Sequence, residues 1–139
     1  MGNRISLKEA IRFHGHLGPY LVLGILAGEA ALKKLGCKKY FGLEIKVRGA
    51  AKKPRSCLID GLQLATGATY GKGNINKLNG SLIKIVFQDR ISKKKITLSL
   101  KNNLIKKLKE VKTHQDAELL AKQLYKTNYS NLFSLKLTA

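Results

Sequence analysis

Apolar residues recur along the chain at two different spacings, and this difference separates predicted helices from predicted strands. A helix places them three or four positions apart, whereas a half-buried strand places them at every second position. The helical spacing occurs in five segments: residues 7–14, 19–35, 56–66, 104–111 and 117–124. Alternation or a short apolar run occurs in four: residues 43–48, 82–88, 96–100 and 133–137.

These elements predict an α+β fold with helices packed on a small sheet of about four strands. The two strands before and after residues 89–95 are expected to form a hairpin. The sequence has 139 residues and contains no repeat, no proline-rich linker and no low-complexity block. We therefore expect one domain that spans residues 1–139.

The first two predicted helices have recognisable ends. Ser6 and Glu9 form the capping-box pattern, and Gly15 ends the helix that they begin. Pro19 suits the first position of the next helix, because its missing amide proton would have no partner there. Gly36 ends that helix. The second helix is apolar nearly all round, so it is predicted to be the buried central helix.

Two glycines, Gly24 and Gly28, lie one turn apart on this central helix. Glycine in a helix interior costs stability. We expect the pair to permit the close approach of another backbone.

The chain is strongly basic. It has 27 Lys and Arg residues against 8 Asp and Glu, which gives a formal net charge of +19. This charge favours an anionic partner such as a nucleic acid, an acidic protein face or a phosphorylated ligand. The hydrophobic share, 44%, is that of an ordinary globular protein and excludes a disordered chain.

Cysteine content and the N-terminal sequence predict where the protein works. Cys37 and Cys57 are too few for a disulfide-stapled scaffold, and the chain opens without the pattern of a secretory signal. The most apolar stretch, residues 20–32, is shorter than the roughly 18 residues that a membrane span needs. We expect a reduced, cytoplasmic protein with no membrane segment.

His14 and His16 are the first candidates for chemistry. The glycines around them favour an extended segment, in which residues two apart point to the same side. Imidazole is a common ligand of zinc and similar metals. A pair of capping or packing histidines is the alternative, and the spacing alone leaves both open.

Cys57 lies near the start of a predicted helix, with Lys52, Lys53 and Arg55 just before it. The helix dipole and these cations are expected to stabilise a thiolate, the form that binds metal. With the two histidines it would supply three ligands and leave a fourth position open, as in catalytic zinc sites. Asp60, one turn later, would orient a ligand histidine or a water, or be a surface acid.

A glycine-rich segment, residues 67–74, is a weaker candidate. It lacks the spacing of a phosphate-binding Walker loop. Its amides could still face an anion, with Lys72 adding charge and Thr69 and Asn74 adding polar contacts. A loop that only turns the chain is the equal alternative. His114, at a predicted helix start, is expected to be a surface residue.

Three segments together resemble the FmdE family, named for the E component of formylmethanofuran dehydrogenase: residues 13–20 (FHGHLGPY), 57–63 (CLIDGLQ) and 66–74 (TGATYGKGN). Their order and spacing agree with the family, and the resemblance covers roughly residues 6–100. It implies a mixed sheet, a homodimer and a metal site built from His and Cys. It also implies a role in the one-carbon metabolism of methanogen-like archaea, beside a molybdenum or tungsten oxidoreductase.

The chain departs from this family pattern at two positions. Gly18 and Ala68 stand where many members have cysteines, so only His14, His16 and Cys57 are carried over as metal ligands. The resemblance implies zinc as the metal, with iron as second choice. The C-terminal zinc ribbon of some members is absent from this sequence.

Two other functions compete with metal binding. The charge favours a nucleic-acid-binding module through phosphate contacts, although the aromatic residues show no stacking pattern. A non-catalytic accessory subunit, docking through a basic surface on an acidic enzyme, is the other.

Overall fold

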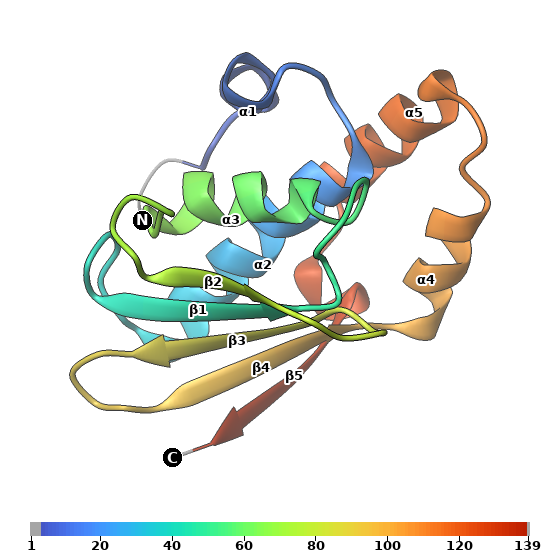
Figure 1. Ribbon diagram of the computed structural model, residues 1–139. Helices are drawn as coiled ribbons and strands as arrows, with labels where there is room; N and C mark the ends of the chain where they lie inside the picture. The colour runs from blue at the N-terminus through green and yellow to red at the C-terminus, as the bar shows by residue number, and fades with distance from the viewer. Residues whose placement is uncertain (1–3, 139) are drawn as a thin grey trace.

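A computed structural model describes residues 4–138 as a five-stranded sheet with helices on one side of it, of which the last two lie past the end of the strands (Figure 1). The helices are α1 (Leu7–His14), α2 (Pro19–Leu35), α3 (Cys57–Thr66), α4 (Asn102–Lys109) and α5 (His114–Tyr125). The strands are β1 (Leu43–Arg48), β2 (Ile75–Leu78), β3 (Lys84–Asp89), β4 (Lys95–Leu100) and β5 (Phe133–Thr138), the last preceded by a short 3-10 turn, Tyr129–Asn131. The α+β class is confirmed.

The sheet is mixed, with strand order β2-β1-β3-β4-β5. β1 and β2 run parallel, and the other neighbouring pairs are antiparallel. Residues of β1 alternate strictly between buried and exposed. Ile45 faces Phe87 on one side and Ile75 on the other, so the buried positions of three strands form one apolar face beneath the helices.

β2 makes the sheet five-stranded rather than four-stranded, and the sequence pattern did not predict it. Its four residues, Ile75 to Leu78, do not alternate, and the two in the middle are polar and exposed. The strand pairs on one side only, at the edge of the sheet. Such a short edge strand is specified by its neighbour β1 more than by its own pattern.

α2 is the central buried helix, as predicted, and Gly24 is where α3 crosses it. A Cβ atom on Gly24 would lie 2.0 Å from the carbonyl oxygen of Leu58, and one on Gly61 would lie 2.1 Å from that of Leu21. A Cβ atom on Gly28 would lie 2.8 Å from the Cβ atom of Ala65. The predicted close approach is therefore confirmed, and it sets the position of α3 over α2.

The ends of α1 and α2 follow the predicted signals. The Ser6 hydroxyl accepts from the Glu9 amide at 3.1 Å, and the Glu9 carboxylate accepts from the Ser6 amide at 3.2 Å. Gly15 and Gly36 close the two helices in the left-handed conformation, with φ of 112° and 64°. Both ends of α1 are thus held, which fixes where the segment 14–18 begins.

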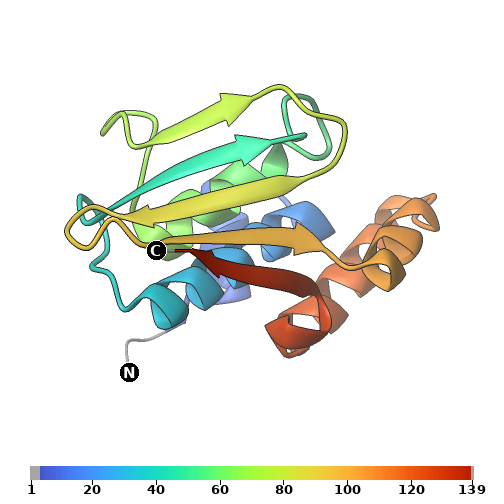
Figure 2. The same ribbon diagram turned by 90° about the horizontal axis from the view of Figure 1, so that it is seen from below.

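The face of the sheet opposite the helices is uncovered, as the view from below shows (Figure 2). We call this surface the open sheet face; its charged residues are Glu44, Lys46, Arg48, Lys84, Lys95 and Lys136. Glu44, the one acid in this set, forms an ion pair with Arg90 at 3.3 Å. The open sheet face is therefore strongly basic.

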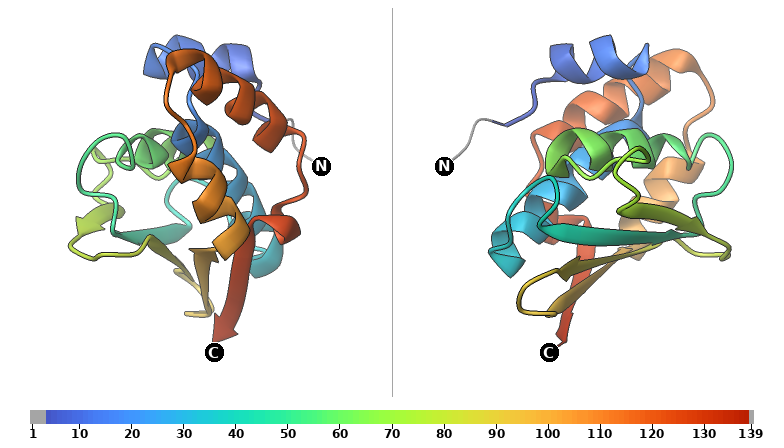
Figure 3. Two further views of the ribbon diagram at one scale, coloured as in Figure 1. Left: turned by 90° about the vertical axis from the view of Figure 1, so that its right-hand side faces the viewer. Right: turned by 60° about the vertical axis from the view of Figure 1, so that its left-hand side comes forward.

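α4 and α5 lie beyond one end of the sheet, and α5 packs against α2 (Figure 3). The Tyr125 hydroxyl donates to the carbonyl of Ile5 at 2.8 Å, which ties α5 to the segment before α1. Among the described residues no single helix has the length and hydropathy of a membrane span; α1 and α2 pass that test only as a pair, bent by 120°.

Candidate metal and ligand cavity

The segment of His14 and His16 and the segment of Cys57 meet at one cavity of about 380 Å³, which we call the histidine cavity. The end of α1, the first turns of α2 and α3, and the connection between α4 and α5 surround it. Its lining residues are His14, His16, Gly18, Pro19, Tyr20, Leu21, Pro54, Cys57, Leu108, Val111, Lys112, Thr113, His114 and Ala117.

His14 and His16 are adjacent, with ring centroids 4.9 Å apart and planes inclined by 54°. The backbone between them differs from the expected extended segment, because His14 is the last residue of α1 and Gly15 is left-handed. The turn at Gly15 still brings the second imidazole beside the first. A Cβ on Gly18 would lie 3.6 Å from the His16 ring, so this glycine leaves room around that ring.

Asp60 holds the His14 ring from one side. Its Oδ2 lies 2.6 Å from the Nδ1 of His14, while the imidazole side chain is only 11% exposed. The other ring nitrogen, Nε2, is buried and has no hydrogen-bond partner in the described structure. Buried polar atoms are nearly always paired, so an unpartnered one requires an explanation.

This arrangement matches that of a metal-binding histidine. Such a histidine usually donates one ring N–H to a carboxylate, which fixes the tautomer and presents the second nitrogen to the metal. In the tautomer that directs Nδ1–H at Asp60, the Nε2 of His14 presents a lone pair to the metal. Asp60 thus occupies the orienting position, one of the two alternatives that its spacing left open.

Cys57 lines the same cavity, but its thiol differs from expectation. Burial raises the pKa of Cys57, Asp60 raises it further, and Lys53 offsets only part of this. Lys53 acts in the expected direction, but the expected net stabilisation of the thiolate is wrong, because burial and Asp60 outweigh this cation. One reason is that Arg55 is engaged elsewhere, donating to the carbonyls of Gly49 and Ser81 at 3.2 and 2.8 Å.

The three expected ligands therefore share a cavity without forming a closed cluster. Within residues 4–138 no three His, Cys, Asp or Glu side chains stand close enough together to hold one ion. The imidazole and thiol donors suit zinc, and the unpartnered Nε2 of His14 is directed by a carboxylate as a ligand would be. The donor types fit a metal.

The glycine-rich segment lies at the opposite end of α3. Asn74 is 1% exposed; its amide nitrogen donates to the carbonyls of Tyr40 and Leu43, and its oxygen accepts from the amide of Thr69. The Thr69 hydroxyl accepts from the backbone and the side chain of Lys72. Thr69, Lys72 and Asn74 are thus placed within a self-bonded turn, away from the histidine cavity.

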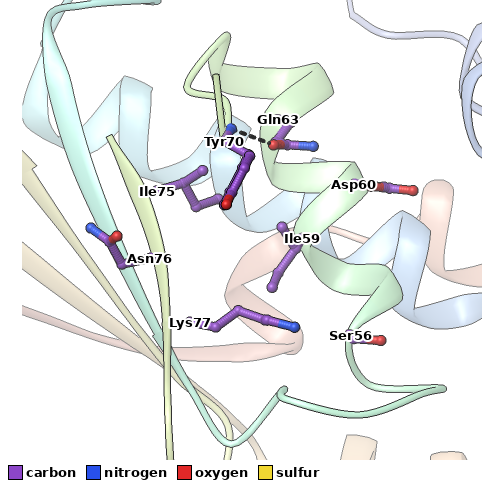
Figure 4. Close-up of a pocket in the computed structure, with 8 residues that line it drawn as sticks. All are labelled: Ser56, Ile59, Asp60, Gln63, Tyr70, Ile75, Asn76 and Lys77. Carbon is purple, nitrogen blue, oxygen red and sulfur yellow. Dashed lines mark hydrogen bonds between the residues drawn. The ribbon is translucent and has the colours of Figure 1, made fainter. Parts of the chain in front are cut away.

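A second cavity, of about 410 Å³, lies between α3 and the edge strand β2 (Figure 4). Ile59, Ile75 and Tyr70 supply apolar surface, and Gln63 accepts from the amide of Tyr70 at 2.9 Å. Asp60 is at its rim with its carboxylate turned away from the other labelled side chains (Figure 4). This groove does not share the histidines.

Sequence reasoning missed the wall formed by residues 108–117. His114 is exposed, as expected of a surface residue, but it also lines the histidine cavity with Lys112. No local pattern marks these residues, because they reach the cavity only through the packing of α5 on α2. The helix start at Thr113 was the one available signal, and its hydroxyl accepts from the Asp116 amide.

Comparisons with known proteins agree with this fold. A crystal structure of a tungsten formylmethanofuran dehydrogenase FmdE-like protein from Syntrophus aciditrophicus superimposes with a TM-score of 0.70, at 20% identity, over 95% of this chain and 69% of that one. A probable S-adenosyl-L-methionine-binding protein of Archaeoglobus fulgidus is 36% identical over 73 residues, or 50% of this chain. The chain covers only 19% of that protein's length.

The family comparison covers nearly the whole sequence. The model of the FmdE family, described as "Molybdenum formylmethanofuran dehydrogenase operon", matches residues 13–136. This range includes His14, His16, Cys57, strands β1 to β4 and most of β5. The chain therefore belongs to the FmdE family.

Proposed function

We propose that this protein binds one divalent metal ion in the histidine cavity through His14, His16 and Cys57, with zinc preferred and iron second. The observation that carries the proposal is the buried Nε2 of His14, which has no partner while Asp60 holds Nδ1. The presence of His16 and Cys57 on the same cavity supports it. Because the three groups do not form a closed cluster in the described residues, they must move closer together to share the ion.

Each residue has a separate task in this proposal. Asp60 keeps the His14 ring in the tautomer whose Nε2 can bind. Cys57 must give up its proton, since the thiolate is the ligand form. A bound zinc with three protein ligands would supply a Lewis acid with one open position.

Elemental analysis tests the metal directly. Wild-type protein purified without chelators is expected to carry about one equivalent of zinc per chain, and His14→Ala, His16→Ala and Cys57→Ala are each expected to lose it. Cys37→Ala is the matched control, because this second half-buried cysteine lies outside the cavity. Metal-free wild type whose thermal stability does not change on adding zinc would contradict the proposal.

Asp60→Asn probes the orienting contact. The amide keeps the size of the side chain but weakens the hold on the Nδ1–H of His14. We expect zinc affinity to fall by about 10- to 100-fold, the usual effect of losing such a partner. An unchanged affinity would show that Asp60 does not act on the ligand histidine.

A second candidate function, that of an accessory subunit, is favoured by the open sheet face. There Arg48 stands directly opposite Lys84, and like charges in such a pair repel each other. An acidic protein surface would remove this repulsion. We propose that the chain, as a cytoplasmic homodimer, docks in this way on a molybdenum or tungsten formylmethanofuran dehydrogenase-type enzyme in one-carbon metabolism.

Co-purification from the native source tests this docking. Arg48→Glu with Lys84→Glu is expected to abolish co-purification of the oxidoreductase. Lys106→Glu with Lys107→Glu changes the net charge equally but on α4, and is expected to preserve it. If neither double variant loses the co-purified oxidoreductase, docking through the open sheet face is contradicted. If the wild-type protein instead binds RNA in a salt-dependent way, the nucleic-acid-binding alternative is favoured.

A further inference from the structure

The histidine cavity holds cationic and hydrogen-bond-donating groups that the proposed metal does not use. We propose that it binds a small organic carboxylate with an apolar body, whose charged end is held by Lys112, His114 and the first amides of α2. The inference names the ligand class of the cavity described under the proposed function, and rests on that function only in sharing this site.

The charge around the cavity favours an anion. The ammonium group of Lys112 is a positive charge in its lining, and that lining within residues 4–138 includes no carboxylate. Two acids of that segment, Glu110 and Asp116, lie outside the lining, and the Asp116 carboxylate accepts from the Lys112 backbone amide at 3.1 Å. The ammonium group of Lys112 is left to act on a ligand.

Tyr20 adds no negative charge to this lining. Burial raises the pKa of Tyr20, and the nearby Arg55 guanidinium offsets only part of that effect. The phenol therefore keeps its proton at neutral pH and remains able to donate a hydrogen bond.

The start of α2 supplies uncapped amides at the same place. Its N-cap is Gly18, which has no side chain to accept a hydrogen bond, and the first helical residue, Pro19, has no N–H. The amides of Tyr20 and Leu21 have no acceptor within their own helix. Both residues line the cavity, at the positive end of a 17-residue helix.

The start of α5 lies across the same cavity. Thr113 caps only the Asp116 amide, so the amides of His114 and Gln115 also lack an acceptor within the helix. Together with the amides at the start of α2, these amides give the cavity several hydrogen-bond donors that have no acceptor within the helices. A bound carboxylate supplies two acceptor oxygens.

The remaining walls explain why the ligand has an apolar body. Six apolar residues from four parts of the chain line the cavity: Pro19, Leu21, Pro54, Leu108, Val111 and Ala117. The volume, about 380 Å³, is that of a small-molecule site. A purely ionic ligand such as phosphate would leave these walls in contact with water.

Hexanoate is a suitable probe, with hexanamide as its neutral counterpart and acetate as its truncated one. Titrations of the full chain, followed by the NMR shifts of backbone amides, are done on metal-free and on zinc-loaded protein. We expect saturable hexanoate binding with shifts of the amide signals of Tyr20, Leu21 and His114. The affinity for hexanamide is expected to be lower than that for hexanoate by about tenfold or more. Acetate is expected to bind more weakly, because it covers less of the apolar wall.

Variants then separate this inference from metal binding. Lys112→Ala and His114→Ala are each expected to weaken hexanoate binding about three- to tenfold while zinc content stays at that of wild type. Lys109→Ala is the matched control, because this lysine is on α4 but outside the lining. His14→Ala is expected to lose zinc.

The inference would be overturned, even if zinc binds, by any of three results. These are equal affinity for hexanoate and hexanamide, the absence of saturable shifts, or a hexanoate affinity of Lys112→Ala equal to that of wild type. Saturable hexanoate binding to a protein that takes up no zinc would instead leave the inference standing and remove the proposed metal site.

Discussion

The candidate functional residues of the sequence lie near the two ends of α3. The two groups differ in whether their polar atoms have hydrogen-bond partners within the protein. At the C-terminal end, Asn74 forms three hydrogen bonds within the protein, and Thr69 and Lys72 bond to each other. At the N-terminal end, His14 has one ring nitrogen on Asp60 and the other, although buried, on nothing.

This difference distinguishes a structural polar cluster from a ligand site. A buried polar group that is satisfied within the fold stabilises it, whereas one left unsatisfied costs free energy until a ligand completes it. The glycine-rich turn therefore holds the start of β2 in place. Binding is expected in the histidine cavity, at the N-terminal end of α3.

The substitution Gly61→Ala should have the largest effect on stability, because it disrupts the packing of α3 against α2, and both groups of residues depend on the position of α3. The new Cβ would lie 2.1 Å from the Leu21 carbonyl oxygen and 2.7 Å from the Ile25 amide nitrogen. We expect a loss of about 3 kcal/mol or more of unfolding free energy, measured by urea denaturation.

Gly73→Ala is the matched control for that substitution. Its φ of +72° strains any other residue, but no neighbouring atom lies within 4 Å of the added Cβ. The expected cost is about 1 kcal/mol. Equal losses for the two variants would show that the contact between α2 and α3 is looser than described.

Asn74→Ala sharpens the comparison from the structural end. Removing this side chain leaves the carbonyls of Tyr40 and Leu43 without their donor in a buried place. We expect about 2–3 kcal/mol of destabilisation, measured by urea denaturation. Zinc content is expected to stay that of wild type. Loss of metal from a still-folded Asn74→Ala protein would contradict the separation of the two ends.

The pH dependence of zinc affinity sharpens it from the other end. Because burial raises the pKa of Cys57, the proton competes with zinc through neutral pH. Affinity is expected to rise about tenfold for each pH unit below that pKa from the thiol alone. Competition with a chromophoric chelator measures the affinity, and a zinc affinity that does not change with pH through neutral pH would contradict the role of the thiol.

The stability of the metal-free protein should follow pH in the opposite direction. A folded-state pKa above the unfolded one means that the Cys57 thiol contributes stability below the unfolded pKa, which is lost as pH rises through the folded one. Burial raises the pKa of Cys37 in the same direction. The expected signature is therefore the difference between wild type and Cys57→Ala in alkaline urea denaturation; an identical decline would contradict it.

Lys72→Ala should have the smallest effect. Its ammonium group lies 5.5 Å from the centre of the Phe41 ring and 5.9 Å from that of Tyr40, on an exposed surface. We expect a loss of about 0.5 kcal/mol in unfolding free energy, with unchanged binding of zinc and hexanoate. A large drop in hexanoate affinity would make the glycine-rich turn a ligand site again.

The local signals predicted most of the fold. The capping box at Ser6 and Glu9, the stop at Gly15 and the paired Gly24 and Gly28 each act over a few residues or along one helix face. Their consequences can therefore be derived from neighbours in sequence. β2 escaped because its pairing with β1 depends on a parallel neighbour about 30 residues away.

The candidate site was predictable only in its residue types. The sequence marked two imidazoles and one thiol, and the fold brought them to one cavity. It did not show that burial and Asp60 would raise the pKa of Cys57, or that Lys112 and His114 would face the same space.

From the order of its residues alone, this chain specifies its helix ends, its buried central helix and the kinds of donor that it offers. Tertiary packing decides which polar atoms are left without a partner. Helix caps and amphipathic faces are short-range properties of a chain, whereas burial, electrostatic neighbours and hydrogen-bond satisfaction depend on segments far apart in sequence. The contact between His14 and Asp60, 46 residues apart, is of this second kind.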